Sequence, residues 1–293
     1  MFNLLTFNTG LLSLFGNRIQ PAPYVLERLA AMPDAMLDSH VDVIALQEIY
    51  DESHRRFLIS RLRCTYPHVA YSRGGLLLGL ENGLMIFSKH EMTAVFERFR
   101  TGTIDEMLFD RKGILSTMIR LGDQPSIALF NVHTTAGGLF SHPENVRVDD
   151  IRRRQIEQLL NLTESCRDTM TIIVGDLNAG PGVSENNYHL LGSHGFIDIH
   201  QMIHGNCNDP TWEPTNLLNR DGPHKTSPAQ RIDHVFVRSC DLDLKAIRPV
   251  SSAIVFKDAR VPISGNRKVT LSDHYGLRVA LDIAGVPGTR QDS

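Results

Sequence analysis

The 293-residue sequence predicts an α/β protein in which two mixed β-sheets pack together and helices cover their outer faces. Short runs with strand character recur from one end of the chain to the other, bounded by polar or glycine-containing turns. Helical patterns lie between some of these runs, but without the strict alternation of a βαβ protein. Hydrophobic residues make up 42% of the chain, which is enough for a large core.

The expected elements follow from these patterns in order. Eight strands are expected at residues 2–7, 41–46, 83–87, 114–120, 127–132, 171–174, 232–237 and 275–281. Three helices are expected at residues 24–37, 53–62 and 149–162. Pro33 predicts a break in the first helix, because proline removes a backbone donor. No repeat, low-complexity tract or linker divides the chain, so residues 1–293 are expected to form one domain.

The overall composition excludes several classes of protein. The net charge of −3 gives no general attraction for a polyanion, although a nuclease can still bind through a metal and a local patch. The four cysteines lie far apart, which argues against a zinc module or a disulfide scaffold and favours free thiols in a reducing compartment. Residues 1–17 lack the basic start of a signal peptide, and no apolar run is long enough to span a membrane. A soluble, cytoplasmic protein is expected.

Several expected strands end in polar residues. Asn8, Glu48 and His133 each follow an apolar strand, and Asp176 and Asn178 follow another. Functional side chains commonly gather at strand ends, where a rigid sheet holds their geometry. In extended chain, Asp176 and Asn178 lie on the same side, so that one can hold a water or a metal while the other donates to a phosphate oxygen. The alternative is a simple Asp/Asn turn.

The segment near the C-terminus places Asp273 next to His274, just before the last strand. Histidine is the side chain best suited to accept a proton near neutral pH, and it usually needs an orienting carboxylate on its other nitrogen. Asp233, on a neighbouring strand, is the candidate for that carboxylate. Glu48 offers an oxygen ligand suitable for Mg²⁺. Each of these residues alone could equally be a solvated polar side chain.

Taken together and in order, these motifs resemble the endonuclease/exonuclease/phosphatase superfamily over nearly the whole chain. The motifs are Asn8, Gln47-Glu48, Asn82-Gly83 through Phe87-Ser88-Lys89, His133, Gly175-Asp176-Leu177-Asn178, Asp233 and Ser272-Asp273-His274. The resemblance implies a four-layer sandwich of two mixed β-sheets flanked by helices. It also implies metal-dependent hydrolysis of a phosphoester, with Mg²⁺ as the usual cation and Mn²⁺ or another divalent cation as the alternative.

The resemblance also implies a role for each residue. Glu48 resembles the principal metal ligand, and Asn8 and Asp273 line the metal side of the site. His274, oriented by Asp233, resembles a base or proton relay. Asp176 resembles the residue that positions or deprotonates the attacking water. Asn178 and His133 resemble the groups that hydrogen-bond the phosphoryl oxygens. Whether Asp176 or His274 takes the proton stays open.

Some segments resemble neutral sphingomyelinases in particular. They are Ala45-Leu46-Gln47-Glu48-Ile49-Tyr50-Asp51, the segment from Gly83 to His90, Lys112-Gly113, and Thr211-Trp212-Glu213-Pro214 with Asn216. His133 fits the deoxyribonuclease and sphingomyelinase branches, whereas abasic-site endonucleases typically carry tyrosine. The implied reaction is hydrolysis of sphingomyelin to ceramide and phosphocholine. His234, where tyrosine is common, the residues after His133 and the polar stretch 217–228 depart from the pattern and leave the head group open.

A lipid substrate requires contact with a membrane surface. Two apolar stretches, 76–80 and 253–256, are candidates for shallow insertion, with a place in the core as the alternative for each. The second is preferred, because it precedes Ser272-Asp273-His274, where bacterial sphingomyelinases carry a membrane-contacting hairpin. The basic cluster of Arg147, Arg152, Arg153 and Arg154 is interpreted as a solvated face rather than a phosphate site.

Two single residues are set aside. Trp212 could stack on a quaternary ammonium group, but packing within a loop is the favoured interpretation. Lys112 stays outside the expected site, because no acidic residue upstream stands at the position that the resemblance requires.

Two other functions compete with the lipid phosphodiesterase. A metal-dependent nuclease of the deoxyribonuclease branch would need a basic groove and would lose activity steeply with salt, and the net charge does not support it. A catalytically inactive binding module on the same fold is the other alternative. The complete set of polar motifs argues against it.

Overall fold

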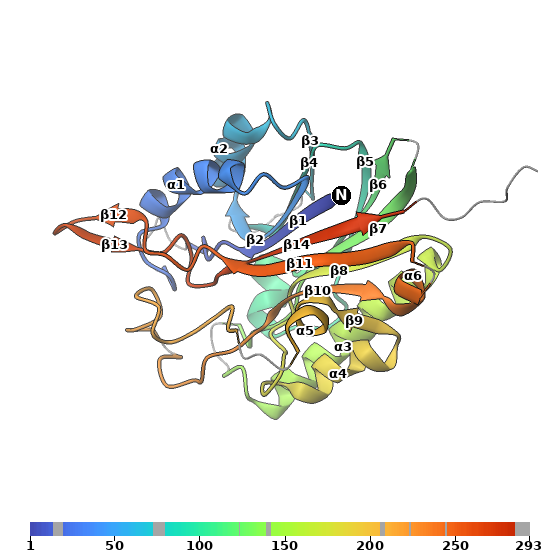
Figure 1. Cartoon of the computed structure of the whole chain (residues 1–293). Helices are drawn as coiled ribbons and strands as arrows, with labels where there is room; N and C mark the ends of the chain where they lie inside the picture. The colour runs from blue at the N-terminus through green and yellow to red at the C-terminus, as the bar shows by residue number, and fades with distance from the viewer. Residues whose placement is uncertain are drawn as a thin grey trace, which may run out of the picture.

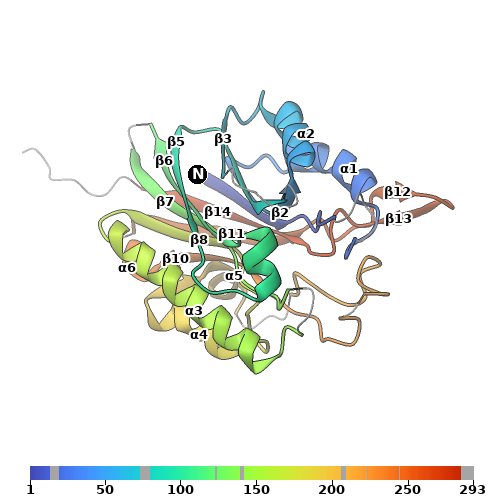
Figure 2. The same ribbon diagram turned by 180° about the vertical axis from the view of Figure 1, so that it is seen from behind.

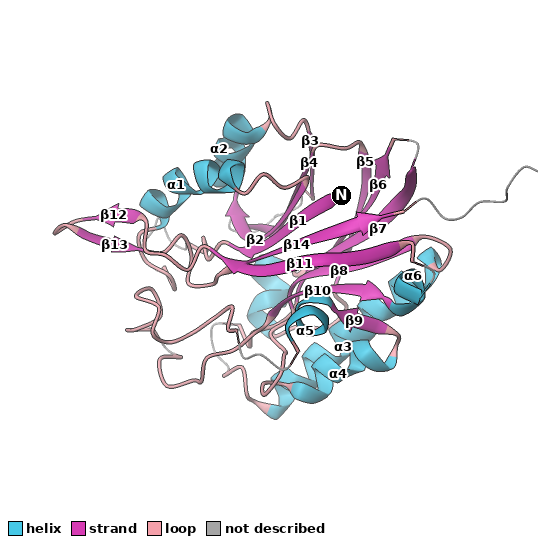
Figure 3. Ribbon diagram, viewed as in Figure 1, coloured by secondary structure: helices cyan, strands magenta, loops and turns pink. Residues whose placement is uncertain are grey.

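A computed structural model of the chain describes residues 1–13, 20–72, 80–122, 124–138, 142–205, 209–222, 224–243 and 245–284 (Figure 1). Two six-stranded sheets lie face to face, with helices on both outer sides. Figure 3 shows the layers by colour, with cyan helices above and below the magenta strands. The expected class, two packed mixed sheets flanked by helices, is therefore confirmed.

The first sheet contains both ends of the described chain. Its strand order is β11 (Ile247–Val255), β14 (Gly276–Ile283), β1 (Phe2–Asn8), β2 (Val43–Asp51), β4 (Leu80–Ser88) and β3 (His68–Tyr71). The β1–β2 pair is parallel, and the other neighbouring pairs are antiparallel.

The second sheet has the same size and the same mixture of directions. Its strand order is β5 (Met92–Arg98), β6 (Gly113–Leu121), β7 (Gln124–His133), β8 (Met170–Asp176), β10 (Asp233–Arg238) and β9 (Phe196–Asp198). Only β7 and β8 are parallel among its described pairs. A separate hairpin, β12 (Val261–Ile263) and β13 (Arg267–Val269), projects from the body of the molecule (Figure 1).

Alternation along the strands separates the core into layers. On β1, Leu4 packs between the two sheets, whereas Leu5 faces the helices outside the first sheet. On β8, Ile172 packs between the sheets, and Ile173 faces the helices outside the second sheet. Successive strand side chains point to opposite faces, so an entirely apolar strand fills two core layers at once.

The helices cover the outer faces of the sheets. α1 (Val25–Asp38) and α2 (Glu52–Leu62) lie over the first sheet, and α3 (Val146–Thr163) and α4 (Glu185–Ser193) lie over the second, as both views show (Figures 1 and 2). Short helices α5 (Ile199–His204) and α6 (Ser239–Asp243), a π-helical turn (Glu106–Asp110) and a 3-10 turn (Glu164–Cys166) complete the described helical structure. The four layers follow from the two pairs of helices and the two sheets.

All eight expected strands and three expected helices are present, each overlapping its expected range. The predicted break at Pro33 is wrong, because α1 continues through it. Proline costs one backbone hydrogen bond there, but the ring is buried beside Met32 and Met36 on the face that packs against the sheet. The strands β3, β5, β9 and β11, the hairpin and α4 to α6 were not expected.

Among the helices in the part of the chain that the structure describes, none has the length and apolar character that crossing a membrane requires. The longest of the described helices is α3, which has 18 residues and carries several charged side chains.

Candidate active site

The strand ends that carry the expected polar residues meet at one edge of the two sheets. Asn8 of β1 pairs with Gln47 of the parallel strand β2, and His133 of β7 pairs with Asp176 of the parallel strand β8. β10 runs antiparallel to β8 and places Asp233 opposite Asp176. The structure thereby brings together all the expected site residues: Asn8, Glu48, His133, Asp176, Asn178, Asp233, Asp273 and His274.

Glu48 leaves the regular alternation of β2. Its backbone is left-handed, with φ 64°, and the pairing with β4 shifts register between Leu46 and Ile49. Such a bulge turns a side chain toward a new direction. Gln47 stays buried between the sheets, whereas Glu48 Oε1 accepts a hydrogen bond from Asn8 Nδ2 at 3.1 Å. The bulge is what directs Glu48 into the site.

Asp233 and His274 form a buried pair. His274 Nδ1 lies 2.9 Å from Asp233 Oδ2, so Nδ1 carries a proton and donates it to the carboxylate. The other ring nitrogen, Nε2, lies 3.9 Å from Asp176 Oδ2. Burial by itself lowers the pKa of His274, but the charges of Asp233 and Asp176 outweigh it and raise the pKa well above its ordinary value. The imidazole is therefore a strengthened base that a carboxylate orients.

Asp176 and Asn178 lie on one turn after β8. Asp176 Oδ1 accepts from the backbone nitrogen of Asn178 at 2.8 Å, and Oδ2 accepts from Asn8 Nδ2 at 2.9 Å. Asn178 has a left-handed backbone, φ 46°, and its Nδ2 donates to the Thr134 carbonyl at 3.1 Å. Burial and the charge of Asp233 raise the pKa of Asp176. The two interpretations of this segment are therefore compatible, since an Asp/Asn turn holds the site residues in place.

Lys112, which the sequence left outside the site, lies inside it. Its ammonium nitrogen is 3.1 Å from His133 Nε2 and donates to the Thr134 carbonyl at 3.0 Å. His133 Nε2 in turn lies 3.6 Å from Asp176 Oδ2. Burial and the charge of Lys112 hold the pKa of His133 well below its ordinary value. His133 is therefore neutral at pH 7 and next to a cation.

The acidic partner of Lys112 is Glu106, on the π-helical turn before β6. Glu106 Oε1 lies 3.3 Å from the Lys112 ammonium, and both side chains are buried. Burial alone would raise the pKa of Glu106, but the charge of Lys112 brings it below the ordinary value. The signal that could have found this pair is an acidic residue six positions before Lys112, a spacing that differs from the one that the resemblance requires.

Asp273 reaches the site from the loop before β14, which the segment 211–219 holds in place. The Asp273 carbonyl accepts from Asn219 Nδ2 at 3.0 Å. Thr211 Oγ1 accepts from the backbone nitrogen of Asp233 at 3.1 Å, and the Thr211 carbonyl accepts from the backbone nitrogen of Tyr275 at 2.6 Å. Thr211 thus fixes both sides of the Asp233–His274 pair, a role that its position in the sequence did not reveal.

Glu48 and Asp273 fit a divalent cation. Burial and, next, the charge of Asp273 raise the pKa of Glu48 to about 7. A second carboxylate close by has this effect, and a divalent cation between the two would reverse it. Carboxylate oxygens are the ligands that Mg²⁺ prefers, and the Glu48 side chain keeps 20% of its surface exposed, which suits a partly hydrated ion. Asn8 donates to Glu48 through its amide nitrogen, and its Oδ1 accepts from the Gly10 backbone nitrogen at 3.0 Å.

A second group of possible ligand atoms belongs to Asp176, Asp233 and His274, which lie within 4.8 Å of one another. In this group, one carboxylate already bonds the imidazole, and the other lies 3.9 Å from its Nε2. Its arrangement suits the transfer of a proton better than the binding of a cation.

Arg28 lies close to the carboxylates of Asp273 and Glu48. Its fully buried guanidinium donates to the backbone carbonyls of Thr9, Gly10, Ala22, Pro23 and Leu271. Burial lowers its pKa to about 10, against the effect of Asp273 and Glu48, so the group remains charged at neutral pH. Arg28 therefore ties the loop after β1 to the segment that carries Asp273.

The membrane-contact prediction for residues 253–256 is wrong. Ile254 and Val255 belong to β11 and pack against the two cores, and Phe256 is buried against Phe7 with 5.1 Å between the ring centroids. The strand pairs along its whole length with β14, which leaves no segment free to insert. Of the other candidate stretch, residues 76–79 lie outside the described residues.

The remaining sequence candidates have structural roles. Trp212 is buried, as the favoured interpretation has it, and its backbone bridges to His274. Arg153 and Arg154 form surface ion pairs with Asp150. Arg152 corrects the interpretation of the basic cluster as a solvated face, because its side chain is buried and bonds backbone carbonyls.

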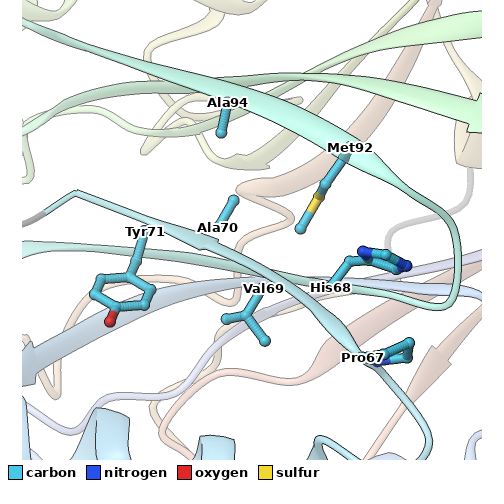
Figure 4. A pocket seen from close by; sticks show the side chains of 7 residues that line it. All are labelled: Pro67, His68, Val69, Ala70, Tyr71, Met92 and Ala94. Atoms are coloured by element: carbon cyan, nitrogen blue, oxygen red, sulfur yellow. The ribbon is translucent and has the colours of Figure 1, made fainter.

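A cavity of about 420 Å³ lies between β3 and β5, lined by Pro67, His68, Val69, Ala70, Tyr71, Met92 and Ala94 (Figure 4). β3 pairs with the 85–88 end of β4, whereas the active site lies beyond the other end of that strand. The cavity is lined by none of the site residues.

Comparison with known sequences agrees with the geometry. Residues 5–274 match the sequence model of the Endonuclease/Exonuclease/phosphatase family. The chain belongs to this family. Its members hydrolyse phosphoric esters, in keeping with the assembled carboxylates, histidines and amides.

Two curated relatives cover most of the chain. The inositol phosphosphingolipids phospholipase C of Saccharomyces cerevisiae is 29% identical over 315 residues, which cover 95% of this chain and 63% of the yeast protein. The sphingomyelinase C of Listeria ivanovii is 23% identical over 241 residues, which cover 77% of this chain and 70% of that protein. The chain therefore spans less than two thirds of the length of the yeast relative.

Solved structures share the fold. A mutant of beta toxin from Staphylococcus aureus with bound magnesium ions superposes with a TM-score of 0.72 and 17% identity, over 94% of this chain and 98% of the toxin. D. rerio TDP2 complexed with single strand DNA product superposes with a TM-score of 0.69 and 15% identity, over 96% and 98% of the two chains. The same fold thus serves proteins with different ligands, so the substrate must be argued from the site.

Proposed function

We propose that this chain is a divalent-cation-dependent phosphodiesterase that cleaves a sphingomyelin-type phospholipid into ceramide and a phosphorylated head group. The observation that carries the proposal is the arrangement around Asp176. The Asp233–His274 pair approaches it from one side, and the Lys112–His133 pair and Asn178 approach it from another. A base and a set of donors around one point are what attack on a phosphodiester requires.

His274 takes the proton of the attacking water in this proposal. Both oxygens of Asp176 already accept hydrogen bonds, which suits Asp176 to hold a water rather than to titrate. The hydrogen bond from His274 Nδ1 to Asp233 stabilises the imidazolium that forms when Nε2 accepts a proton. Burial lowers the pKa of His274, and the Asp233 carboxylate is the largest of the influences that raise it.

Asn178 donates hydrogen bonds to the phosphoryl oxygens, and the Lys112 ammonium places a positive charge beside them. One N–H of the Asn178 amide is bound to Thr134, which fixes the group and leaves the other N–H for a ligand. The Lys112 ammonium is held by Glu106 and by the Thr134 carbonyl, so it is already in place before the reaction. Donors that need no reorganisation stabilise the developing negative charge most effectively.

Glu48 and Asp273 are the residues that would hold the divalent cation, and Asn8 fixes Glu48 through its amide nitrogen. When bound, the cation supplies a Lewis acid that neutralises negative charge on the phosphoryl group. The magnesium ions named for the beta toxin mutant support Mg²⁺ as the first ion to test.

A lipid substrate is supported by the two curated relatives, which are both named for sphingolipid hydrolysis. The projecting β12–β13 hairpin supports contact with a lipid surface (Figure 1). Exposed basic side chains at Lys257, Arg260, Arg267 and Lys268 accompany it, with Asp258 as the acidic residue. A peripheral contact with anionic lipids through charge is therefore proposed, in place of insertion by residues 253–256.

The test is hydrolysis of sphingomyelin, an inositol phosphosphingolipid, phosphatidylcholine and plasmid DNA side by side, with Mg²⁺ and with chelator. His274→Gln is the blank, and His189→Gln on the exposed face of α4 is the matched control. Head-group release from a sphingolipid that requires Mg²⁺ and His274 supports the proposal. Cleavage of DNA alone would assign the chain to the nuclease branch, and no cleavage of any substrate would refute the proposal.

A further inference from the structure

A second buried ion cluster lies on the face of β10 opposite Asp233. The Asp198 carboxylate, at the end of β9, accepts hydrogen bonds from Arg231, from Tyr188 at 3.0 Å and from His234 Nδ1 at 2.8 Å. The Arg231, Asp198 and His234 side chains are each at most 3% exposed. Asp198 also caps α5, since its Oδ1 accepts from the backbone nitrogen of His200 at 2.9 Å. The cluster thus joins α4, α5, β9 and β10.

The ring of His234 is held at both of its nitrogens. Nδ1 faces the Asp198 carboxylate, and Nε2 lies 2.9 Å from the carbonyl oxygen of Ala179. The Ala179 carbonyl can only accept, so Nε2 donates to it, whereas Nδ1 faces both the Asp198 carboxylate and Arg231 Nη1, which lies 3.3 Å away. Arg231 and His234 together hold the pKa of Asp198 well below its ordinary value, although burial alone would raise it. The ring orientation is therefore fixed by charge as well as by hydrogen bonds.

The Ala179 carbonyl belongs to the turn that presents Asn178. The turn begins at Leu177, whose backbone nitrogen donates to the Ile232 carbonyl at 2.9 Å. It then passes through the left-handed Asn178, and a Cβ at Gly180 would lie 1.8 Å from the Arg231 carbonyl. The turn therefore rests directly on the chain that carries the cluster.

His234 donates a side-chain hydrogen bond to the peptide that joins Ala179 to Gly180, one peptide beyond Asn178. The Ala179–Gly180 peptide adjoins the Asn178–Ala179 peptide at the Cα atom of Ala179, so a shift of the Ala179 carbonyl would be passed along the backbone to Asn178. Asn178 itself lies only two residues from Asp176, whose Oδ1 binds the Asn178 backbone. A hydrogen bond on the outer face of the sheet thus restrains a group on the reacting face.

We propose that His234 is a positioning residue that fixes the 176–180 turn through the Ala179 carbonyl, and thereby the Asn178 amide that meets the phosphoryl group. The inference rests on the proposed function, since it concerns the same site. The tyrosine expected at this position of the sequence has one hydroxyl donor, whereas histidine bonds the turn and Asp198 at once.

Two amide substitutions separate the two hydrogen bonds of the ring. In His234→Gln, the amide nitrogen takes the place of Nε2 and can still bind Ala179, whereas in His234→Asn it takes the place of Nδ1 and can bind only Asp198. We expect kcat with Mg²⁺ to fall about tenfold in His234→Asn with little change in KM, because a small misplacement of a catalytic donor is costly. His234→Gln should retain kcat within about threefold.

Two further measurements exclude a merely structural role. In an Asn178→Ala background, His234→Asn should cause no further loss of kcat, since its effect passes through Asn178. His200→Gln is the matched control, because this buried histidine of α5 bonds Ser252 Oγ of β11 at 2.8 Å. It should lower the melting temperature and leave kcat unchanged.

A readout without turnover keeps the inference separate from the proposed function. We expect the side-chain amide protons of Asn178 to exchange faster with solvent in His234→Asn than in wild type or His234→Gln, as measured by NMR without substrate. If no phosphodiester is cleaved but the exchange changes as expected, the positioning stands and the proposed function fails. Equal losses in both variants, additivity with Asn178→Ala or unchanged exchange in His234→Asn would each overturn the inference.

Discussion

At the scale of single residues, burial and the charge of Lys112 together set the state of His133. The two side chains are buried together, with 3.1 Å between the ammonium nitrogen and His133 Nε2. Burial disfavours a second proton on the imidazole, and a cation at that distance acts in the same direction, so the pKa of His133 is low. The neutral ring accepts a hydrogen bond from Lys112, so the positive charge stays on the ammonium group, where it can stabilise a phosphoryl group.

Lys112→Met tests this role. Removal of the ammonium should raise the pKa of His133 toward its ordinary value and lower kcat/KM about a hundredfold, because one preorganised charged donor is lost. An NMR titration of His133 and steady-state kinetics measure the two effects. Lys89→Met is the control, since Lys89 pairs with Asp42 away from the site and its loss should change neither quantity. An unchanged His133 pKa in Lys112→Met would contradict this account.

At the scale of secondary structure, the parallel strands β7 and β8 bring His133 and Asp176 side by side. Gly175 makes that approach possible at the end of β8. Its φ is +130°, and a Cβ there would lie 1.9 Å from the Val132 carbonyl oxygen. Only glycine fits both the backbone angle and the spacing.

Gly175→Ala should therefore destabilise the protein by roughly 3 kcal/mol or more, because the added methyl must displace a paired strand. Urea unfolding monitored by circular dichroism measures the loss. Gly192→Ala in α4 is the matched control. A Cβ at that position meets nothing within 4 Å, and alanine should stabilise the helix by about 0.5–1 kcal/mol. Similar stabilities for the two variants would refute the steric account.

The β12–β13 hairpin is the other element with a testable role. Arg267→Glu combined with Lys268→Glu should weaken binding to vesicles that contain phosphatidylserine about tenfold or more, since each basic residue near such a surface contributes roughly 1 kcal/mol. Sedimentation with the vesicles at low and high salt measures the effect, which salt should screen. Arg63→Glu with Arg147→Glu gives the same change in net charge elsewhere and should bind as wild type does. If the two hairpin substitutions left vesicle binding unchanged, the hairpin would be excluded as the membrane contact.

At the scale of the whole molecule, the carboxylates of the site cost stability when no cation is bound. The pKa of Glu48 is raised to about 7 in the folded protein, from about 4.5 in a model compound. The folded state therefore binds more protons than the unfolded state between these values, and the free energy of unfolding falls as the pH rises through this window. Glu48→Gln lacks this titration.

In chelator, Glu48→Gln should be more stable than wild type at pH 8 by on the order of 2 kcal/mol, and the difference should vanish at pH 4. Mg²⁺ in large excess should raise the melting temperature of wild type, because a ligand of the folded state stabilises it by about 2.7 kcal/mol at one hundred times its Kd. The variant should respond far less. Calorimetry with and without Mg²⁺ checks both expectations, and an equal response of the two proteins would move the cation site away from Glu48.

The local patterns of the sequence determined the elements and the chemistry of their ends. Runs such as residues 171–174 predict a strand buried on both faces because three of the four side chains are aliphatic and occupy both faces, and this holds in β8. Polar residues placed directly after such runs, as Asp176 and His133 are, predict a site at the strand ends. Short or half-exposed elements carry no comparable pattern, which is why β5 and β9 were not expected.

Contacts between distant segments were decided only by the tertiary structure. The sequence does not show that Glu106 forms an ion pair with Lys112, that His234 reaches the Ala179 carbonyl, or that Pro33 can stay inside a helix. It also offered residues 253–256 as a candidate for membrane contact, whereas residues 253–255 pair with β14 and Phe256 is buried. The periodicity of a segment predicts which of its side chains face the core and which face solvent, because that pattern depends on the segment's own residues. The partner of a buried charge depends on which strands and turns the fold places beside it, and that is set by packing across the whole chain.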